Sequence, residues 1–264
     1  MSEFGVCNLS IVPIRAEASD KSEVLSQLLF GDCFEILEFT DKWVNIRTCF
    51  DEYEGWIDIK QFIPTKSCIS KSTGQTHILG LKPFHEAIKL STGEKLYLVA
   101  GSSIPDLNNK HFFLGTEEYQ LNSDTLIDIN ADLGDLVVEY SKFYLQAPYL
   151  WGGKSVFGID CSGLTQIVYK MLGKTLKRDA WQQAEQGEIV NFLQEARPGD
   201  LAFFDNAEGR VIHVGIMLDD QHIIHASGRV KIDPIDGQGI YSLDLKKHTH
   251  KLRIIKRSFT STLS

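Results

Sequence analysis

Cys161 is the residue whose surroundings most clearly indicate chemistry. It lies in Asp160-Cys-Ser-Gly-Leu164, and the apolar residues that follow have the 3,4-spacing of a helix. At the N-terminus of a helix, unpaired N–H groups and the helix dipole stabilise a thiolate, which lowers the thiol pKa from roughly 8.5. We therefore predict that Cys161 is a nucleophile, that Asp160 caps the helix, and that Ser162 and Gly163 let substrate approach closely. The remaining cysteines lack such a setting and are expected to pack or to lie on the surface: Cys7, Cys33, Cys49 and Cys68.

Two histidines downstream complete a catalytic set. His213 begins His-Val-Gly-Ile-Met-Leu218, a run with the alternation of a strand, and a neutral imidazole there can accept the thiol proton. His225, in Ile-Ile-His-Ala-Ser227, is expected to orient His213 and fix its tautomer. His222 is three residues away on the same strand and therefore faces the other side, so we favour His225. The alternative for His213 is a core histidine with satisfied hydrogen bonds.

Two aromatic residues precede the cysteine loop in Pro-Tyr-Leu-Trp-Gly-Gly153. The Tyr149 phenol can donate to the oxyanion of a tetrahedral intermediate, together with the Cys161 N–H. The alternative is that Tyr149 only packs under the glycine turn. Trp151 is expected mainly in the core, and its place in the loop also makes it a candidate for contact with the substrate.

The elements around these residues indicate an α+β domain. Spacing predicts an amphipathic helix through Leu133, Leu136, Val137, Tyr140 and Phe143, the Cys161 helix, and a helix over Ala180–Glu188. Strands are predicted at Leu201–Phe204, Val211–Leu218, His222–Ala226 and Leu252–Lys256. Helices followed by an antiparallel sheet are an α+β order.

The N-terminal half reads as short strands separated by turn signals. Strands are predicted at Val6–Ile14, Ser26–Leu29, Cys33–Phe39, Trp43–Thr48 and Gly55–Ile59. The order Val12-Pro-Ile-Arg15, Gly31-Asp32, Trp43-Val-Asn-Ile-Arg47 and Gly55-Trp-Ile57 resembles bacterial SH3-like domains, with another small β-barrel as the alternative. A weaker set follows at Thr76–Gly80, Lys95–Ala100, His111–Leu114 and Thr125–Ile127. We predict two SH3-like barrels, at 1–66 and 67–128, and a catalytic domain at 129–264.

Composition excludes several classes of protein. The 264 residues fit two or three domains, and a formal net charge of −8 without a basic tract argues against nucleic-acid binding. Five cysteines without a CxxC pair indicate neither disulfides nor a zinc site. No basic-then-apolar leader and no apolar run of ~20 residues is present. We expect a cytoplasmic protein without a membrane span, or a periplasmic or extracellular one if an export signal has been removed.

Five ordered motifs place the C-terminal half beside a known family. Tyr149-x-Trp-Gly-Gly, Asp160-Cys-Ser-Gly-Leu164, Arg197-Pro-Gly-Asp-Leu201, His213-Val-Gly-Ile216 and Ile224-His-Ala-Ser227 resemble the NlpC-type cell-wall peptidases, over about residues 130–257. The resemblance implies a papain-like fold, a catalytic triad of Cys161, His213 and His225, a role for Tyr149, and no metal or organic cofactor.

SH3-like domains ahead of such a peptidase narrow the resemblance to γ-D-glutamyl-L-diamino-acid endopeptidases. It implies cleavage of the D-Glu–diamino acid bond in murein-derived peptides with a free N-terminal L-Ala, in peptide recycling, by a monomer. The resemblance implies that Asp179, next to the substrate-binding candidate Arg178, binds the ammonium, that Ala180 replaces a serine there, and that Tyr53 is the SH3-domain tyrosine. Asp179 equally fits a helix N-cap. A general wall hydrolase, a thiol amidase on another acyl-amine and a wall-binding protein remain alternatives, as do lysine and diaminopimelate in the substrate.

Overall fold

The computed structural model describes residues 3–68, 76–122 and 133–258. The chain divides into two compact units, Met1–Asp128 and Ile129–Ser264. None of the helices in the described ranges has both the length and the apolar character of a transmembrane span.

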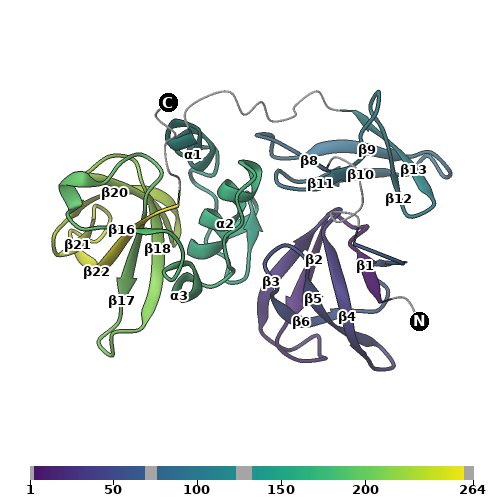
Figure 1. The fold of residues 1–264 in the computed structure, drawn as a ribbon, viewed down its shortest axis with the longest axis horizontal. Coiled ribbons are helices and arrows are strands. Elements are labelled where there is room, and N and C mark those ends of the chain that lie inside the picture. Colours follow the sequence, from purple (N-terminus) through teal and green to yellow (C-terminus); the bar gives the residue numbers. More distant parts are fainter. Residues whose placement is uncertain (1–2, 69–75, 123–132, 259–264) are drawn as a thin grey trace. The chain divides into compact units, whose positions relative to one another are not determined.

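The first unit begins with a seven-stranded antiparallel sheet in the order β3-β2-β6-β5-β4-β1-β7 (Figure 1). Alternating residues of these short strands point inward, as Val12 and Ile14 do, and form one apolar core. The predicted strand Val6–Ile14 is wrong in extent, because the chain turns within it and forms two strands. The strands are β1 Phe4–Val6, β2 Ile11–Arg15, β3 Val24–Leu29, β4 Cys33–Phe39, β5 Trp43–Thr48, β6 Glu54–Asp58 and β7 Ile63–Thr65.

Residues 76–122 add a four-stranded sheet, β10-β9-β13-β12, and a two-stranded sheet, β11-β8. Their core is continuous with the preceding strands, since Phe30 packs edge-on against Phe112 and Tyr119. The predicted strand Thr125–Ile127 lies outside the described residues. The strands are β8 Thr76–Ile78, β9 His85–Lys89, β10 Lys95–Leu98, β11 Ser103–Pro105, β12 His111–Leu114 and β13 Glu117–Asn122.

The second unit places its longer helices before its main sheet. The predicted amphipathic helix forms as α1, Leu133–Lys142, which buries Leu136, Val137 and Tyr140. Every residue of α2, Cys161–Met171, is buried. A hairpin of β14, Lys154–Ser155, and β15, Gly158–Ile159, precedes α2. The predicted helix Ala180–Glu188 is wrong in extent: α3, Ala180–Gln183, is one turn. Beyond it, Gly187 adopts a φ of 78° and leads into a strand.

The main sheet of this unit closes on itself. Its order is β16-β22-β17-β18-β19-β20-β21, and β22 also pairs with β21. Six antiparallel strands thus form a ring, which brings side chains distant in sequence to a common interior. The strands are β16 Glu188–Val190, β17 Leu201–Asp205, β18 Val211–Met217, β19 His222–Ser227, β20 Arg229–Asp236, β21 Gly239–Ser242 and β22 Lys247–Arg257, and a 3₁₀ turn η2 spans Leu193–Glu195.

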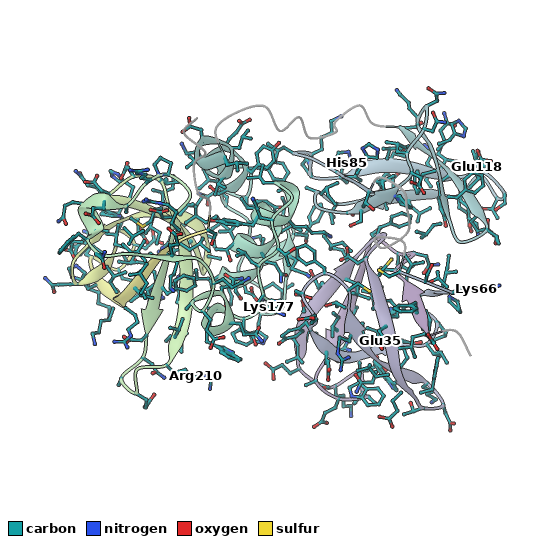
Figure 2. The ribbon with its side chains drawn as sticks, viewed as in Figure 1. Glu35, Lys66, His85, Glu118, Lys177 and Arg210 are labelled. Atoms are coloured by element: carbon teal, nitrogen blue, oxygen red, sulfur yellow. The ribbon has the colours of Figure 1, made fainter. Side chains whose placement is uncertain are left out.

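Helix α2 packs against β18 and β19, and α1 packs against α2 and β18. The turn between β17 and β18 projects away from these helices, with Arg210 near its tip (Figure 2). The first residue of α2 therefore faces the middle strands of the closed sheet.

Candidate active site

Cys161 is the first residue of α2 and is 6% exposed. Asp160 caps this helix, as predicted: its Oδ1 accepts from the Gly163 N–H at 2.6 Å and its Oδ2 from the Gly152 N–H at 2.8 Å. A Cβ at Gly163 would lie 2.3 Å from the carbonyl oxygen of Gly153. Glycine is therefore required by the protein's own backbone, and the predicted close approach of substrate is not needed to explain it.

Arg178 fixes the N-terminal turn of α2 through its side-chain hydrogen bonds. Its side chain is 2% exposed, and its guanidinium bonds both oxygens of the Asp160 carboxylate. It also donates to Ser162 Oγ at 2.8 Å. The polar groups of Arg178 and Ser162, both candidates for substrate contact, are thus used within the protein to position the turn that carries Cys161.

The thiol of Cys161 keeps its proton in the resting protein. Burial, with the negative charge of Asp160, raises the pKa of Cys161 to about 12, against the opposing effect of the Val214 and Ser162 N–H groups and Arg178. The helix dipole contributes at most about 2 kcal/mol, or roughly one and a half pKa units. The expected lowering of the thiol pKa is therefore wrong for the resting protein, because burial outweighs the helix terminus. The thiol needs a base.

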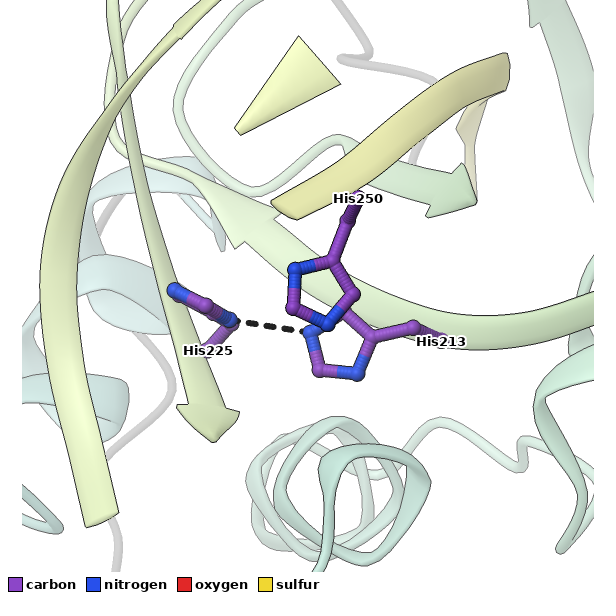
Figure 3. A group of neighbouring side chains, drawn as sticks. All are labelled: His213, His225 and His250. Atoms are coloured by element: carbon purple, nitrogen blue, oxygen red, sulfur yellow. Dashed lines mark hydrogen bonds between the residues drawn. The ribbon is translucent and has the colours of Figure 1, made fainter. Parts of the chain in front are cut away.

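The histidine set lies in the interior of the closed sheet (Figure 3). His213 Nε2 and His225 Nδ1 are 2.9 Å apart, and both residues are buried. Gly215 makes room for this pair, because a Cβ there would lie 2.7 Å from Ile223 Cδ1 and 3.0 Å from His225 Cβ. His222 instead is exposed and bonds Asp219 at 3.0 Å. The structure thus brings together the two histidines that the sequence analysis pairs.

Asp233 on β20 extends this set and is absent from the sequence prediction. Its Oδ2 lies 3.1 Å from His225 Nε2 and 3.1 Å from Lys231 Nζ, and Oδ1 accepts from the Leu243 N–H at 3.0 Å. Burial alone would raise the pKa of Asp233, but these hydrogen bonds lower it to about 2. Asp233 is therefore an ionised acceptor at neutral pH.

An ionised Asp233 fixes the tautomers of both histidines. A carboxylate only accepts, so His225 carries its proton on Nε2 and its Nδ1 must accept. His213 then donates from Nε2, which leaves its Nδ1 with a lone pair. Burial lowers the pKa values of His213 and His225, so both rings are neutral. In Figure 3 the His213 Nδ1 points away from His225.

The second nitrogen of His213 is the candidate base for Cys161. Helix α2, which Cys161 begins, packs on β18, which carries His213. The N–H of Val214, the next residue, acts directly on the thiol. A neutral imidazole with a free lone pair beside a thiol can accept its proton as the sulfur attacks a carbonyl.

Tyr149 lies at the same site. Its N–H donates to the carbonyl oxygen of Gly228 at 3.0 Å, and burial, with the nearby acidic groups of Cys161 and Asp160, raises the pKa of its phenol. The phenol therefore stays protonated and can donate to an oxyanion. Trp151 is 58% exposed, so the expectation that it packs in the core is wrong: the loop turns its ring outward.

The residues predicted to bind the substrate ammonium belong to different units of the chain. Asp179 is the N-cap of α3 in a capping box, with its N–H donating to Gln182 Oε1 at 3.1 Å. Asp179 is half-buried and Ala180 is buried. Tyr53 is half-buried in the first unit, where its N–H donates to Thr48 Oγ1 at 3.0 Å. Their contact with substrate stays a prediction.

Known protein families match one segment in each of the two units. Residues 146–249 match the NlpC/P60 family, and residues 14–62 match the bacterial dipeptidyl-peptidase Sh3 domain. One SH3-like domain is thus indicated.

Similar proteins extend over most of the chain. It is 28% identical over 249 residues to the gamma-D-glutamyl-L-lysine dipeptidyl-peptidase of Bacillus cereus (strain ATCC 10987 / NRS 248), across 84% of this chain and 73% of the relative. The Bacillus subtilis (strain 168) protein of the same name is 28% identical over 255 residues, across 90% and 82%. A crystal structure of an NlpC/P60 family protein from Bacillus cereus ATCC 10987 has the same fold, with a TM-score of 0.81, 21% identity, and coverage of 97% and 99%.

Proposed function

We propose that the chain is a cysteine endopeptidase of peptidoglycan stem peptides, because residues 146–249 match the NlpC/P60 family and residues 14–62 match the bacterial dipeptidyl-peptidase Sh3 domain. The bond that it cleaves joins the γ-carboxyl group of D-Glu to the diamino acid. The observation that carries the chemistry is the hydrogen-bond chain from Asp233 through His225 to His213. The substrate class is supported by the names of the two Bacillus relatives.

The reaction follows from the tautomers. His213 Nδ1 accepts the thiol proton as Cys161 Sγ attacks the γ-glutamyl carbonyl carbon. The Tyr149 hydroxyl and the Cys161 N–H, which as the first N–H of a helix lacks an intrahelical partner, donate to the oxyanion. The imidazolium of His213 then gives its proton to the leaving amine, and a thioester remains. Water, deprotonated by His213, hydrolyses the thioester and restores the thiol.

Specificity for a free N-terminal L-Ala is the finer part of the proposal. The half-buried carboxylate of Asp179, which accepts from a backbone N–H in its capping box, can also accept from an ammonium group, and such a charge-assisted bond is worth about 1.5–3 kcal/mol. Ala180 offers no hydroxyl, so a backbone group or water takes the place of a serine. We propose Tyr53 as a further contributor. An acylated N-terminus would leave the carboxylate without its cation.

The setting of the reaction is also a proposal. We propose cytoplasmic recycling of peptides by a monomer. Five cysteines without a CxxC pair fit the reducing compartment of this proposal. We further propose that residues 67–128 are a diverged second SH3-like domain. The short antiparallel strands of β10-β9-β13-β12 support this, and a strand-by-strand comparison of an experimental structure with residues 14–62 tests it.

The test is a mass-spectrometric digest of L-Ala-γ-D-Glu-L-Lys and its diaminopimelate form, each with a free and with an acetylated N-terminus. We expect the wild type to release L-Ala-γ-D-Glu from the free peptides and Cys161→Ala to release none. Asp179→Asn should lower kcat/KM on the free peptides alone. Equal cleavage of free and acetylated peptides would reject the ammonium specificity, and cleavage of neither would reject this substrate class.

A further inference from the structure

A third histidine lies against the catalytic pair. His250, on β22, stacks on His213 with ring centroids 4.1 Å apart and an interplanar angle of 26° (Figure 3). One nitrogen from each of His213, His225 and His250 lies within 4.8 Å of the other two. His250 comes directly after the segment that matches the NlpC/P60 family, and the reaction described above does not use it.

The outer nitrogens of two rings already have partners that fix their orientation. His225 Nε2 bonds Asp233, and His250 Nδ1 lies 2.8 Å from Thr249 Oγ1. His225 Nδ1 and His250 Nε2 are therefore the nitrogens turned to the centre, together with His213 Nε2. A ligating histidine whose other nitrogen bonds a carboxylate or another polar group is the usual arrangement at zinc centres.

The protonation state also suits a cation. Metal ions bind neutral imidazole, and burial lowers the pKa values of all three histidines, to about 4 for His250. The nearby charges of Lys231 and Asp233 are paired at 3.1 Å and offset each other. His250 is half-buried, whereas His213 and His225 are buried, so His250 is the most accessible of the three to solvent.

We propose that His213, His225 and His250 form a binding site for a divalent cation of the zinc class, and that the bound cation inhibits the peptidase. Zn²⁺ takes imidazole nitrogens at roughly 2.0–2.1 Å in a tetrahedron, which places two ligand nitrogens about 3.3 Å apart. His213 Nε2 and His225 Nδ1 are 2.9 Å apart, so a small separation of these two rings admits the ion. The three nitrogens lie within 4.8 Å of one another, and His250 must turn out of its stack on His213 to direct its in-plane lone pair to the same ion.

Inhibition follows from the tautomer, and this consequence rests on the proposed function. A cation on His213 Nε2 takes the lone pair of that nitrogen, so the ring proton must move through solvent to Nδ1. A protonated Nδ1 faces Cys161 as a donor and cannot accept the thiol proton. The cation therefore competes with the hydrogen bond that prepares the base, and its removal restores that bond.

Binding is tested without catalysis. In Cys161→Ala, which removes the thiol as a ligand, Co²⁺ should give the visible absorption of a tetrahedral site, and Zn²⁺ should displace it. Adding His250→Phe keeps a ring stacked on His213 but removes a ligand, and should weaken Zn²⁺ binding by calorimetry at least about tenfold. The absence of binding by Cys161→Ala, or equal binding by both variants, would overturn the proposal.

Inhibition is tested on the peptide substrate with Zn²⁺ and then with EDTA. Each protein is compared with its own metal-free rate, so that any change in basal rate caused by His250→Phe cancels. We expect reversible inhibition of the wild type and at least about tenfold weaker inhibition of His250→Phe. Equal inhibition would assign the ion to Cys161 and His213 instead and overturn the proposal. Histidine-dependent Co²⁺ binding in a protein without peptidase activity would support the site while rejecting the proposed function.

Discussion

In the proposed mechanism, the position of one proton decides whether Cys161 can react. His213 must carry its proton on Nε2 for Nδ1 to act as a base, and this depends on Asp233, two hydrogen bonds away. Asp233 touches neither the thiol nor the substrate carbonyl. It is a positioning residue, and its effect on catalysis is separable from its effect on stability.

Asp233→Asn should reverse the chain of hydrogen bonds while keeping its shape. The asparagine amide can donate to His225 Nε2, which places the His225 proton on Nδ1 and the His213 proton on its own Nδ1. We expect kcat/KM to fall on the order of 10²–10³-fold, with a normal circular dichroism spectrum. Two-dimensional ¹⁵N NMR of the imidazoles checks the tautomer directly.

The matched control for this substitution is Asp244→Asn. Asp244 also bonds Lys231, at 3.1 Å, but its other partner is Arg229. We expect its kcat/KM to stay close to that of the wild type. Similar losses in both variants would mean that the charge near Lys231 matters, and not the tautomer of His225.

Alkylation of Cys161 should reveal its raised pKa. A pKa of about 12 means that the thiol keeps its proton as the pH rises, so the thiolate fraction grows about tenfold per pH unit below that value. We expect the iodoacetamide rate at Cys161, followed by peptide mass spectrometry, to rise steadily from about pH 7 to about pH 9. A rate independent of pH over this range would instead indicate a thiolate already formed at neutral pH.

The acid limb of the pH profile of kcat/KM should shift to lower pH. Burial lowers the pKa of His213, so the neutral base persists as the pH falls below the ordinary histidine value of about 6.5. The limb should therefore lie below that pH.

Site residues within a local sequence motif can be predicted from the sequence. Residues that reach the site only through strand pairing cannot be predicted in this way. Cys161 is recognisable because a helix pattern and a capping aspartate follow each other directly. Asp233 has no neighbouring motif. Its available signal is that Lys231, Asp233 and Ile235 are alternate inward-facing residues of one strand, where two charges spaced by two indicate a buried pair. His250 comes from β22, and only ring closure brings it to His213.

At the scale of elements, the predicted α+β order is right, and the closure of the sheet could not be predicted. The strand at 252–256 was expectable from its apolar alternation, but β22 runs from Lys247 to Arg257 and pairs on both sides. β20 and β21 contain charged, proline and glycine residues, which interrupt the apolar alternation by which a strand is recognised. Pairing of β21 with β22 depends on contacts remote in sequence, which a local pattern does not contain.

Arg178 should determine the stability of the start of α2. The side chains of Arg178 and Asp160 are 2% and 5% exposed, and removing one partner of a buried pair costs about 3–5 kcal/mol. Arg178→Met should therefore shift urea unfolding of the second unit to a lower midpoint and lower kcat, because the turn before Cys161 loses its support. Fluorescence and activity, followed together, check both effects.

The control variant for Arg178→Met is Arg229→Met. Arg229 and Asp244 form a two-bond pair as well, but their side chains are 41% and 42% exposed. Solvent screens such a pair, so the unfolding midpoint should not change measurably. A midpoint shift of the same size in both variants would contradict the assigned role of the buried pair.

At the scale of the whole molecule, the chemistry belongs to one unit and the predicted specificity draws on both. The clusters around Phe30 and Phe34 contain only residues of the first unit, whereas that around Phe204 contains only residues of the second. Cys161, His213, His225, Asp233 and Tyr149 also come from the second unit alone. Nothing in the hydrogen-bond chain to His213 requires a residue before Ile129.

Residues 129–264 expressed alone should therefore hydrolyse the free peptide, with a kcat within about tenfold of the full chain and with near-UV circular dichroism of a packed core. The full chain should prefer the free peptide over the acetylated one by at least about tenfold, the equivalent of a bond worth about 1.4 kcal/mol. That preference should shrink in the isolated unit, because the predicted contribution of Tyr53 is lost. Tyr53→Phe in the full chain is the matched variant and should shrink it too. If the isolated unit discriminates as well as the full chain, Asp179 alone reads the ammonium and the SH3 domain has another task.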